Sequence, residues 1–393
     1  MKPIYILNGA RTPFSGFGGA LKHVTATELG TIASKGALER SGVKPEEIEH
    51  VFVGNVIATT KNSPYLARHV ALHAGVPIES PALTVNRLCG SGIQAVVSAA
   101  QTILLGEANV VLAAGTENMS QSPYVLRNAR FGTGLKAPEI DDMLWGTLTD
   151  EYIGCGMGIT AENLAERYEI SRQEQDEFAV RSQQLALQAQ RSGRFQQEIV
   201  PVETTDKKGK PVTVADDEHI RADATIENLT RLKPAFKQSG TVTAGNSSGI
   251  NDGAAAVVIA NEDFVNSHAS APLAKILSWG IIGVDPNIMG IGPVPACRLA
   301  LQRAGLSMND MDLVEINEAF ASQYLAVEKE LGLQREKVNV NGGAIALGHP
   351  VGASGARILY SLAVELKSRK QKYGLASLCI GGGQGIAMVI EAV

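Results

Sequence analysis

Short apolar runs alternate with amphipathic stretches along most of this 393-residue chain. The runs at residues 4–7, 51–53, 82–85 and 254–259 predict buried strands, and apolar residues at helical spacing predict helices over 26–40 and 91–105. Gly42 and Gly106 stand where these two helices should end, and residues 9–13 are typical of a turn. Strands that alternate with helices indicate an α/β fold and favour parallel pairing.

The pattern repeats within the chain. Residues 37–43, Ala-Leu-Glu-Arg-Ser-Gly-Val, return at 300–306 as Ala-Leu-Gln-Arg-Ala-Gly-Leu. The same offset relates Ser91-Gly92 to Ser354-Gly355, and each of these pairs follows an expected strand and begins an expected helix. A duplicated α/β unit explains both similarities.

A segment of different character separates the two halves. Residues 119–249 contain long polar stretches, a charged hairpin with its turn at 207–210, and a helix that should begin after Ser171, with Glu174 in the capping-box position, and end at Gly193. We therefore expect a first half made of residues 1–118 and 250–270, an inserted domain at 119–249, and a second half at 271–393.

Composition limits the partners. The net charge is −5 and the only short block of basic residues is 207–210, which argues against a nucleic acid or an anionic membrane. No apolar run approaches the 18 or so residues of a membrane helix, and the first residues lack the features of a signal or transit peptide, so we expect a cytosolic protein. The four cysteines and seven histidines lack metal-ligand spacing, so no metal site is expected.

Cys89 lies where a nucleophile, a tight turn and a helix start coincide. The helix N-terminus should favour the thiolate and lower the pKa of Cys89. Two alternatives stay open at this point. Cys89 could fill core space as a small apolar residue, or residues 90–95 could form a dinucleotide fingerprint, G-x-G-x-x-A, with Glu117 near the end of the next strand.

Three further residues share this setting, because each follows a core strand and has glycines nearby: Asn317, His349 and Cys379. The carboxyl ends of strands in an open α/β sheet border the ligand site, so the three could converge with Cys89 in one pocket. The glycine-rich chain beside them leaves backbone N–H groups free to bind an oxyanion. Singly, Asn317 could cap the helix that begins near 318, His349 could be a loop residue, and Cys379 could be core packing.

The motifs at 86–92, 317–320, 339–350 and 379–385 together resemble those of the thiolase family over essentially the full chain. The resemblance implies the thiolase fold, in which two duplicated five-stranded α/β halves form a five-layer αβαβα core, with the insertion as an α+β loop domain. It also implies acyl-CoA substrates, coenzyme A as a substrate and no permanently bound cofactor. A homodimer or a dimer of dimers is expected from the same resemblance.

Carried over by position, the resemblance assigns five roles. Cys89 resembles the nucleophile that accepts the acyl group, and Cys379 resembles the cysteine that exchanges a proton with acetyl-CoA. His349 resembles the residue that activates Cys89 and helps form one oxyanion hole, and Asn317 the residue that orients a water in that hole. The backbone N–H groups of Cys89 and Gly381 resemble a second hole. Together they imply ping-pong acyl transfer through an S-acyl cysteine.

The resemblance also indicates residues that contact coenzyme A and the acyl chain: Arg221, Ala244, Gly245, Ser248, Met157 and Leu148. Arg221 could instead pair with a nearby carboxylate. Cys155-Gly156-Met157-Gly158 replaces the Tyr-His-Met-Gly element of the short-chain acetoacetyl-CoA thiolases, which leaves room for longer acyl chains. Alternatives are an enzyme restricted to acetoacetyl-CoA and, more remotely, a ketoacyl synthase-like condensing enzyme, in which Cys379 would have no role.

Overall fold

The computed structural model describes residues 3–135, 137–206, 208–268 and 271–393. Its main sheet contains ten of the described strands, and three two-stranded ribbons lie outside it. The strands are β1 (Ile4–Arg11), β2 (Ser15–Gly16), β3 (His50–Gly54), β4 (Ala82–Val85), β5 (Val110–Asn118), β6 (Tyr124–Leu126), β7 (Ile140–Asp142), β8 (Thr149–Asp150), β9 (Cys155–Gly156), β10 (Val202–Thr205), β11 (Pro211–Val214), β12 (Asn251–Asn261), β13 (Ala274–Gly283), β14 (Leu313–Ile316), β15 (Tyr373–Ile380) and β16 (Gln384–Ala392).

The described helices alternate with these strands in both halves. They are α1 (Ala26–Ser41), α2 (Leu66–His73), α3 (Ser91–Leu104), α4 (Met143–Leu148), α5 (Met157–Arg167), α6 (Arg172–Arg191), α7 (Ile226–Leu229), α8 (Glu262–Ser267), α9 (Pro293–Ala304), α10 (Ala321–Leu331), α11 (Ala344–Leu347) and α12 (Ser354–Arg369). The α/β fold class is confirmed.

The main sheet joins the two halves edge to edge. Its order is β14-β15-β16-β13-β1-β12-β5-β3-β4, with β2 paired to β12, and the antiparallel pair β1–β13 makes the junction. Among the described strand pairs, only β3–β4, β3–β5 and β14–β15 are parallel. The sheet is therefore mixed, and the expectation of parallel pairing is wrong where β12 and β16 each insert antiparallel to their neighbours.

The duplication predicted from the sequence is visible in this order. From the junction outward, β1, β12, β5 and β3 of the first half correspond to β13, β16, β15 and β14 of the second. The place of β4 is taken in the second half by a single parallel bridge between Val314 and Val338. The fifth strand of the second half is thus reduced to one bridge within the described residues.

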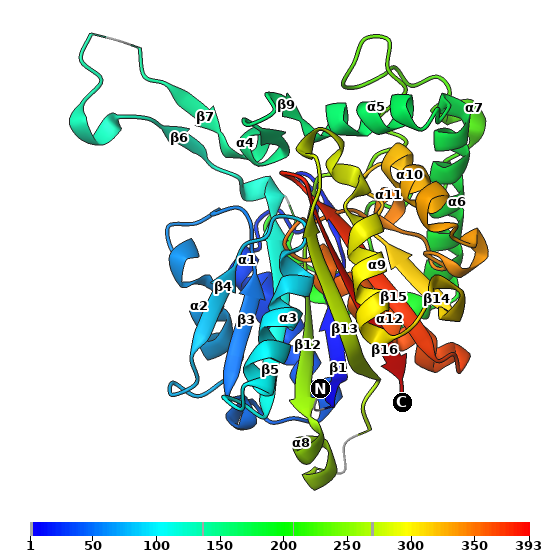
Figure 1. Ribbon diagram of the computed structural model, residues 1–393. Helices are drawn as coiled ribbons and strands as arrows, with labels where there is room; N and C mark the ends of the chain where they lie inside the picture. The colour runs from blue at the N-terminus through cyan, green and yellow to red at the C-terminus, as the bar shows by residue number, and fades with distance from the viewer. Residues whose placement is uncertain (1–2, 136, 207, 269–270) are drawn as a thin grey trace.

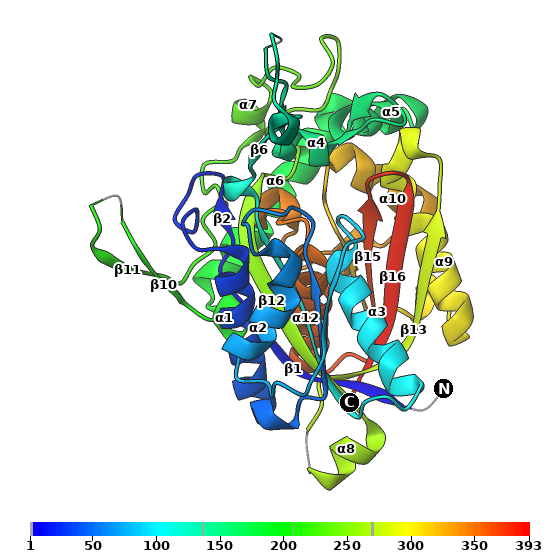
Figure 2. The same ribbon diagram turned by 90° about the vertical axis from the view of Figure 1, so that its left-hand side faces the viewer.

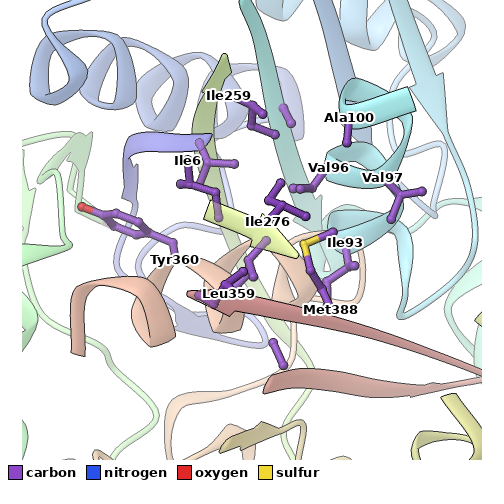
Figure 3. Close-up of a cluster of buried hydrophobic side chains, with 14 of the residues drawn as sticks. Ile6, Ile93, Val96, Val97, Ala100, Ile259, Ile276, Leu359, Tyr360 and Met388 are labelled. Atoms are coloured by element: carbon purple, nitrogen blue, oxygen red, sulfur yellow. The ribbon is translucent and has the colours of Figure 1, made fainter. Parts of the chain in front are cut away.

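Helices cover the two half-sheets in five layers (Figures 1 and 2). Helices α1 and α2 pack on the outer face of the first half, α9 packs on the outer face of the second, and α3 and α12 lie between the two half-sheets. Apolar side chains from both halves meet around this central pair, as Figure 3 shows for Ile6, Val96, Ile276, Leu359 and Met388. The five-layer core expected from the resemblance is confirmed.

Two glycines allow α3 and α12 to approach closely. A Cβ on Gly92 would collide with the backbone nitrogen of Ala356, and a Cβ on Gly355 would collide with that of Ile93. These are the two positions that the internal repeat relates to each other, so the repeat marks the contact between the halves.

Most local predictions hold. Helix α1 ends at Gly42 in a left-handed conformation, and Ser171 and Glu174 form the predicted capping box of α6. The predicted hairpin is β10–β11, although the sequence favoured 199–202 for its first strand, which runs over 202–205. Lys207, in the predicted turn, and residues 269–270, at the predicted boundary of the halves, lie outside the described residues. Strand β1 continues to Arg11, so the turn expected at 9–13 is wrong in its first residues.

Strand β4 differs from its prediction. It pairs only with β3, none of its residues is buried, and Leu83 is 51% exposed. The apolar sequence that predicted a core strand therefore belongs to an open edge of the sheet.

The inserted segment lies over the ends of the strands. Helices α4 and α5 and strand β9 sit above the carboxyl ends of β5 and β15 in Figure 1, and β6 and β7 form a ribbon that projects from the body. None of the described helices is long and apolar enough to cross a membrane.

Candidate active site

Cys89 lies in the loop between β4 and α3, at the junction of the two halves. Leu88 before it has a φ of 46°, a left-handed conformation, and Gly90 after it is the N-cap of α3. The backbone N–H groups of Gly381 and of Cys89 itself donate to the Cys89 thiol. Gly381 follows β15, so the first half supplies the thiol and the second half supplies one of its donors.

The pKa of Cys89 is raised to about 11. Burial is the main cause and the carboxylate of Glu117 adds to it, whereas the two N–H donors act in the opposite direction. The lowered pKa expected from the helix N-terminus is wrong, because the thiol packs against Ile57, Met119 and Val351, where loss of water favours the neutral form. Cys89 is therefore a thiol in the resting protein.

Cys379, near the end of β15, faces the same site. It is fully buried and packs in a cluster with Met289, Ala319, Met157 and Phe320. Burial raises the pKa of Cys379 well above its ordinary value, and the nearby Cys89 raises it further. Because the charge of Cys89 acts on Cys379, the two cysteines lie near each other at one site.

His349 follows the short helix α11, not a strand as its sequence context suggested. Its imidazole is buried: Nδ1 lies 2.6 Å from Ser354 Oγ, and Nε2 lies 3.3 Å from Asn317 Nδ2. The backbone N–H of His349 donates to Asn251 Oδ1 over 2.9 Å. Burial, and then the charge of Arg357, lowers the pKa of His349 to about 3, so the ring is neutral.

Asn317 lies directly after β14 and does not cap a helix. Helix α10 begins at Ala321 with Phe320 as its N-cap, so the capping alternative is wrong. The Asn317 backbone N–H donates to the carbonyl oxygen of Ser377 on β15, two residues before Cys379, over 2.9 Å. Asn317 is 1% exposed and its Oδ1 has no hydrogen-bond partner among the described residues, as expected for an acceptor that binds a water.

Glu117 does not lie where a dinucleotide-binding site would need a carboxylate. Its buried carboxylate accepts hydrogen bonds from the Asn55 amide and from the backbone N–H groups of Val56, Ile57 and Gly352, all at 3.0 to 3.1 Å. Each carboxylate oxygen of Glu117 already accepts two hydrogen bonds, so none is left for a ribose hydroxyl. The first turn of α3 packs on α12, which leaves no room for a pyrophosphate. The dinucleotide alternative is wrong.

Sequence reasoning missed three residues that hold this site together: Glu117, Asn251 and Ser354. Glu117 binds the loop after His349, Asn251 binds the His349 backbone, and Ser354 binds its ring. The internal repeat included Ser354, and the dinucleotide fingerprint pointed to Glu117, but neither pattern predicted these hydrogen bonds. Asn251 carried no signal in the sequence.

Most of the residues expected to contact coenzyme A lie near the same site, whereas no contact among the described residues places Arg221 there. Ser248 donates its backbone N–H to Ala319 O over 3.0 Å, which places the loop of residues 243–249, with Gly245 and the exposed Ala244, beside residues 319–321. Leu148 packs in the cluster that contains Cys89, and Met157 Sδ lies near Gly381. The Arg221 side chain is exposed and forms no ion pair with any described residue.

Fold and site together fit a duplicated α/β protein with a cysteine-based active site at the junction of its halves. Residues 4–263 match the family model of the thiolase N-terminal domain, and residues 270–392 match that of the thiolase C-terminal domain. This chain belongs to the thiolase family, whose members are acyltransferases. Thiolases use coenzyme A as a substrate and hold no permanent cofactor.

Similar proteins span the whole chain. Human mitochondrial 3-ketoacyl-CoA thiolase is 53% identical over 393 residues, with 100% of this chain and 99% of that protein covered. An acetyl-CoA acetyltransferase of Cupriavidus necator is 50% identical over 392 residues, with 100% of both covered. The crystal structure of the human mitochondrial thiolase in complex with CoA has a TM-score of 0.96 at 52% identity and covers 100% of this chain and 98% of that one.

Proposed function

We propose that this protein is a thiolase that converts a 3-ketoacyl-CoA and coenzyme A into acetyl-CoA and a shortened acyl-CoA, or catalyses the reverse condensation. The observation that carries the proposal is the placement of Cys89 within reach of the Gly381 N–H and beside Cys379. A ketoacyl synthase-like reaction is less well supported, because it leaves the buried Cys379 without a role.

In the first half-reaction the Cys89 sulfur attacks the 3-keto carbon, and His349 Nε2 takes the thiol proton. The resulting alkoxide is stabilised by the N–H groups of Cys89 and Gly381, which already point at the sulfur. The bond between C2 and C3 then breaks, and the acyl group remains on Cys89. The departing enolate of acetyl-CoA takes a proton from Cys379, and its oxygen accepts from protonated His349 and from a water held by Asn317.

In the second half-reaction coenzyme A replaces acetyl-CoA. Its thiol gives a proton to the Cys379 thiolate, and its sulfur attacks the acyl group on Cys89. When the tetrahedral intermediate collapses, the Cys89 sulfur leaves and recovers its proton from His349. Each residue has then returned to its starting state, which gives the ping-pong cycle typical of a covalent acyl-enzyme.

The acyl pocket should accept more than one chain length. A Cβ added to Gly156 would meet only Leu148 O at 3.4 Å and Thr149 Oγ1 at 3.9 Å, so the backbone of β9 leaves space where a larger side chain would stand. Relatives near 50% identity include both 3-ketoacyl-CoA thiolases and acetyl-CoA acetyltransferases. Restriction to acetoacetyl-CoA therefore remains the alternative to test.

Location and assembly belong to the proposal as well. The cytosolic location expected from the N-terminal sequence is not supported by the relatives named as mitochondrial, and it stays a prediction. A homo-oligomer is supported by the open edge of β4 and by the projecting β6–β7 ribbon, where Tyr124 is 70% and Phe131 90% exposed.

The test is a thiolysis assay with 3-ketoacyl-CoA substrates of increasing chain length and coenzyme A. We expect cleavage of acetoacetyl-CoA and of longer substrates, measured by loss of the 3-ketoacyl thioester and formation of acetyl-CoA. Cleavage of acetoacetyl-CoA alone would contradict the argument from Gly156, and no cleavage of any substrate would contradict the proposed function.

Single cysteine variants separate the two half-reactions. Cys89→Ser should abolish formation of the acyl-enzyme, whereas Cys379→Ser should still be acylated by an acyl-CoA and should lose carbon–carbon cleavage, as mass spectrometry and the assay would measure. Cys297→Ser is the matched control, because Cys297 is equally buried, lies on α9 and keeps Ser377 as a hydrogen-bond partner. Equal loss of both steps in Cys379→Ser would contradict this division of roles.

A further inference from the structure

We propose that Ser354 is a positioning residue that holds the single imidazole proton of His349 on Nδ1, so that Nε2 alone accepts and returns the proton of Cys89. The statement about the proton concerns the protein itself, and its catalytic consequence rests on the proposed thiolase function. Ser354 is the first residue of α12 and is fully buried.

The proton is located by the second hydrogen bond of Ser354. Its Oγ lies 2.6 Å from His349 Nδ1 and 3.0 Å from the carbonyl oxygen of Pro350. The Ser354 hydroxyl donates to this carbonyl, which also accepts from the backbone N–H groups of Ala353 at 2.9 Å and of Ser354 at 3.0 Å, and this hydrogen bond uses the one hydroxyl proton of Ser354. Ser354 Oγ must then accept from His349, which requires a proton on Nδ1.

The other ring nitrogen gives the same answer independently. His349 Nε2 lies 3.3 Å from Asn317 Nδ2, an amide nitrogen that only donates. A proton on Nε2 would face the amide hydrogens, whereas the lone pair of Nε2 accepts from them. Both sides of the ring therefore favour the same tautomer.

The backbone of this segment keeps the ring in that orientation. Asn251 Oδ1 accepts from the His349 N–H, and Glu117 accepts from the N–H of Gly352, three residues further on. Both acceptors belong to the first half, whereas His349, Pro350 and Ser354 belong to the second. The halves thus fix the loop, and within it the hydroxyl of Ser354 fixes the proton.

With its proton on Nδ1, His349 can serve in two steps of the proposed reaction, as the acceptor of the Cys89 proton and then as a donor to the enolate. When Nε2 takes the Cys89 proton, Nδ1–H stays bound to Ser354, and the new Nε2–H becomes the donor for the enolate oxygen. Without the hydroxyl, only the Asn317 amide still favours the proton on Nδ1, and the fraction of rings protonated on Nε2 can no longer accept from Cys89. The ring would still be present but in the wrong tautomer for part of the time.

The direct test is nitrogen NMR of the protein labelled with ¹⁵N-histidine. The wild type should show a protonated Nδ1 and an unprotonated Nε2 for His349, assigned by the signals that disappear in His349→Asn. In Ser354→Ala the two forms should mix or invert. A wild-type proton on Nε2, or an unchanged tautomer in Ser354→Ala, would overturn the proposal.

Kinetics give the second readout. Ser354→Ala should lower the rate of Cys89 acylation in proportion to the loss of rings with a free Nε2, and by at most about 100-fold, the lower end of what general-base catalysis contributes, with little change in KM. Ser354→Thr keeps the hydroxyl and should retain most of the rate. Ser278→Ala is the matched control, since Ser278 is also buried and donates to a carbonyl, Ala300 O at 2.6 Å, but lies on β13 against α9.

The outcomes separate the two proposals. Thiolysis that fails in the wild type while the NMR shows Nδ1–H would refute the proposed function and leave the tautomer assignment standing. Full activity in Ser354→Ala would overturn the positioning role even if the protein is a thiolase. A fall in rate equal to that in Ser278→Ala would show a merely structural role and would also overturn it.

Discussion

The Cys89 thiol and the His349 ring are both neutral at rest. Burial raises the pKa of Cys89 to about 11 and lowers that of His349 to about 3, so both groups stay uncharged across the physiological range. This differs from a thiolate–imidazolium pair, in which the nucleophile is charged before the substrate arrives. In this site the Cys89 thiol must lose its proton as its sulfur attacks. His349 can take that proton only if its own proton is on the other ring nitrogen.

Alkylation of Cys89 by iodoacetamide should therefore rise steadily toward alkaline pH. Because only the thiolate reacts, a raised pKa makes the rate increase by about tenfold per pH unit between pH 7 and 9. The modified Cys89 peptide can be quantified by mass spectrometry, and Cys89→Ser identifies reaction at the other cysteines. A rate that levels off near neutral pH would show a lowered pKa and contradict the effect of burial.

At the scale of elements, the contact between α3 and α12 sets the distance between the two half-sheets. The helices meet through Gly92 and Gly355, which leave no side chain between the two backbones. Both helices also begin at the site, since Cys89 precedes α3 and Ser354 starts α12. Any separation of the helices would displace Cys89 from the loop that carries His349.

Gly92→Ala should lower the free energy of unfolding by about 1 to 3 kcal/mol, the usual effect of overpacking a core, and should reduce acylation of Cys89. Denaturant or thermal unfolding measures the first effect. Gly146→Ala is the matched control, because Gly146 is also helical but a Cβ there meets no atom within 4 Å. That variant should be neutral or up to about 1 kcal/mol more stable. Equal stability of Gly92→Ala and the wild type would contradict the packing argument.

At the scale of the whole molecule, neither half contains a complete site. The first half supplies Cys89, Asn251 and Glu117. The second supplies Asn317, His349 and Cys379, with Gly381 beside Cys89. The inserted segment adds Leu148 and Met157 above them. The active site is thus a property of the junction, and duplication alone does not create two sites.

Apolar surface left open in the single chain supports an oligomer. Near the edge of β4, Tyr65 is 61%, Ile78 is 72% and Leu83 is 51% exposed. We expect sedimentation to give at least twice the chain mass of 41.4 kDa, and Leu83→Lys to shift the protein toward the monomer. Val212→Lys, on the β10–β11 hairpin, is the control and should leave the mass unchanged. A monomeric wild type would contradict this expectation.

Several features follow from the sequence because their causes are local. The end of α1 at Gly42 and the capping box at Ser171 depend on residues within one helical turn, and the repeat predicted the paired helices α3 and α12. The motifs around Cys89, Asn317, His349 and Cys379 were sufficient to indicate the family. Each of these signals is a short stretch of sequence with its own conformational preference.

Other features depended on groups far apart in the chain. The same apolar pattern gave a core strand at β12 and an open edge at β4, since periodicity does not state how many neighbours a strand will have. The helix start at Cys89 predicted a lowered pKa, but burial by residues from both halves decided its sign.

The sequence by itself thus determined which elements form, that they are duplicated, and to which family the chain belongs. The tertiary structure alone decided the mixed pairing of the sheet, the neutral state of Cys89 and His349, and the supporting contacts of Glu117, Asn251 and Ser354. The physical reason is that caps and periodicity act between neighbouring residues, whereas desolvation and hydrogen bonding between the halves depend on what the fold brings together.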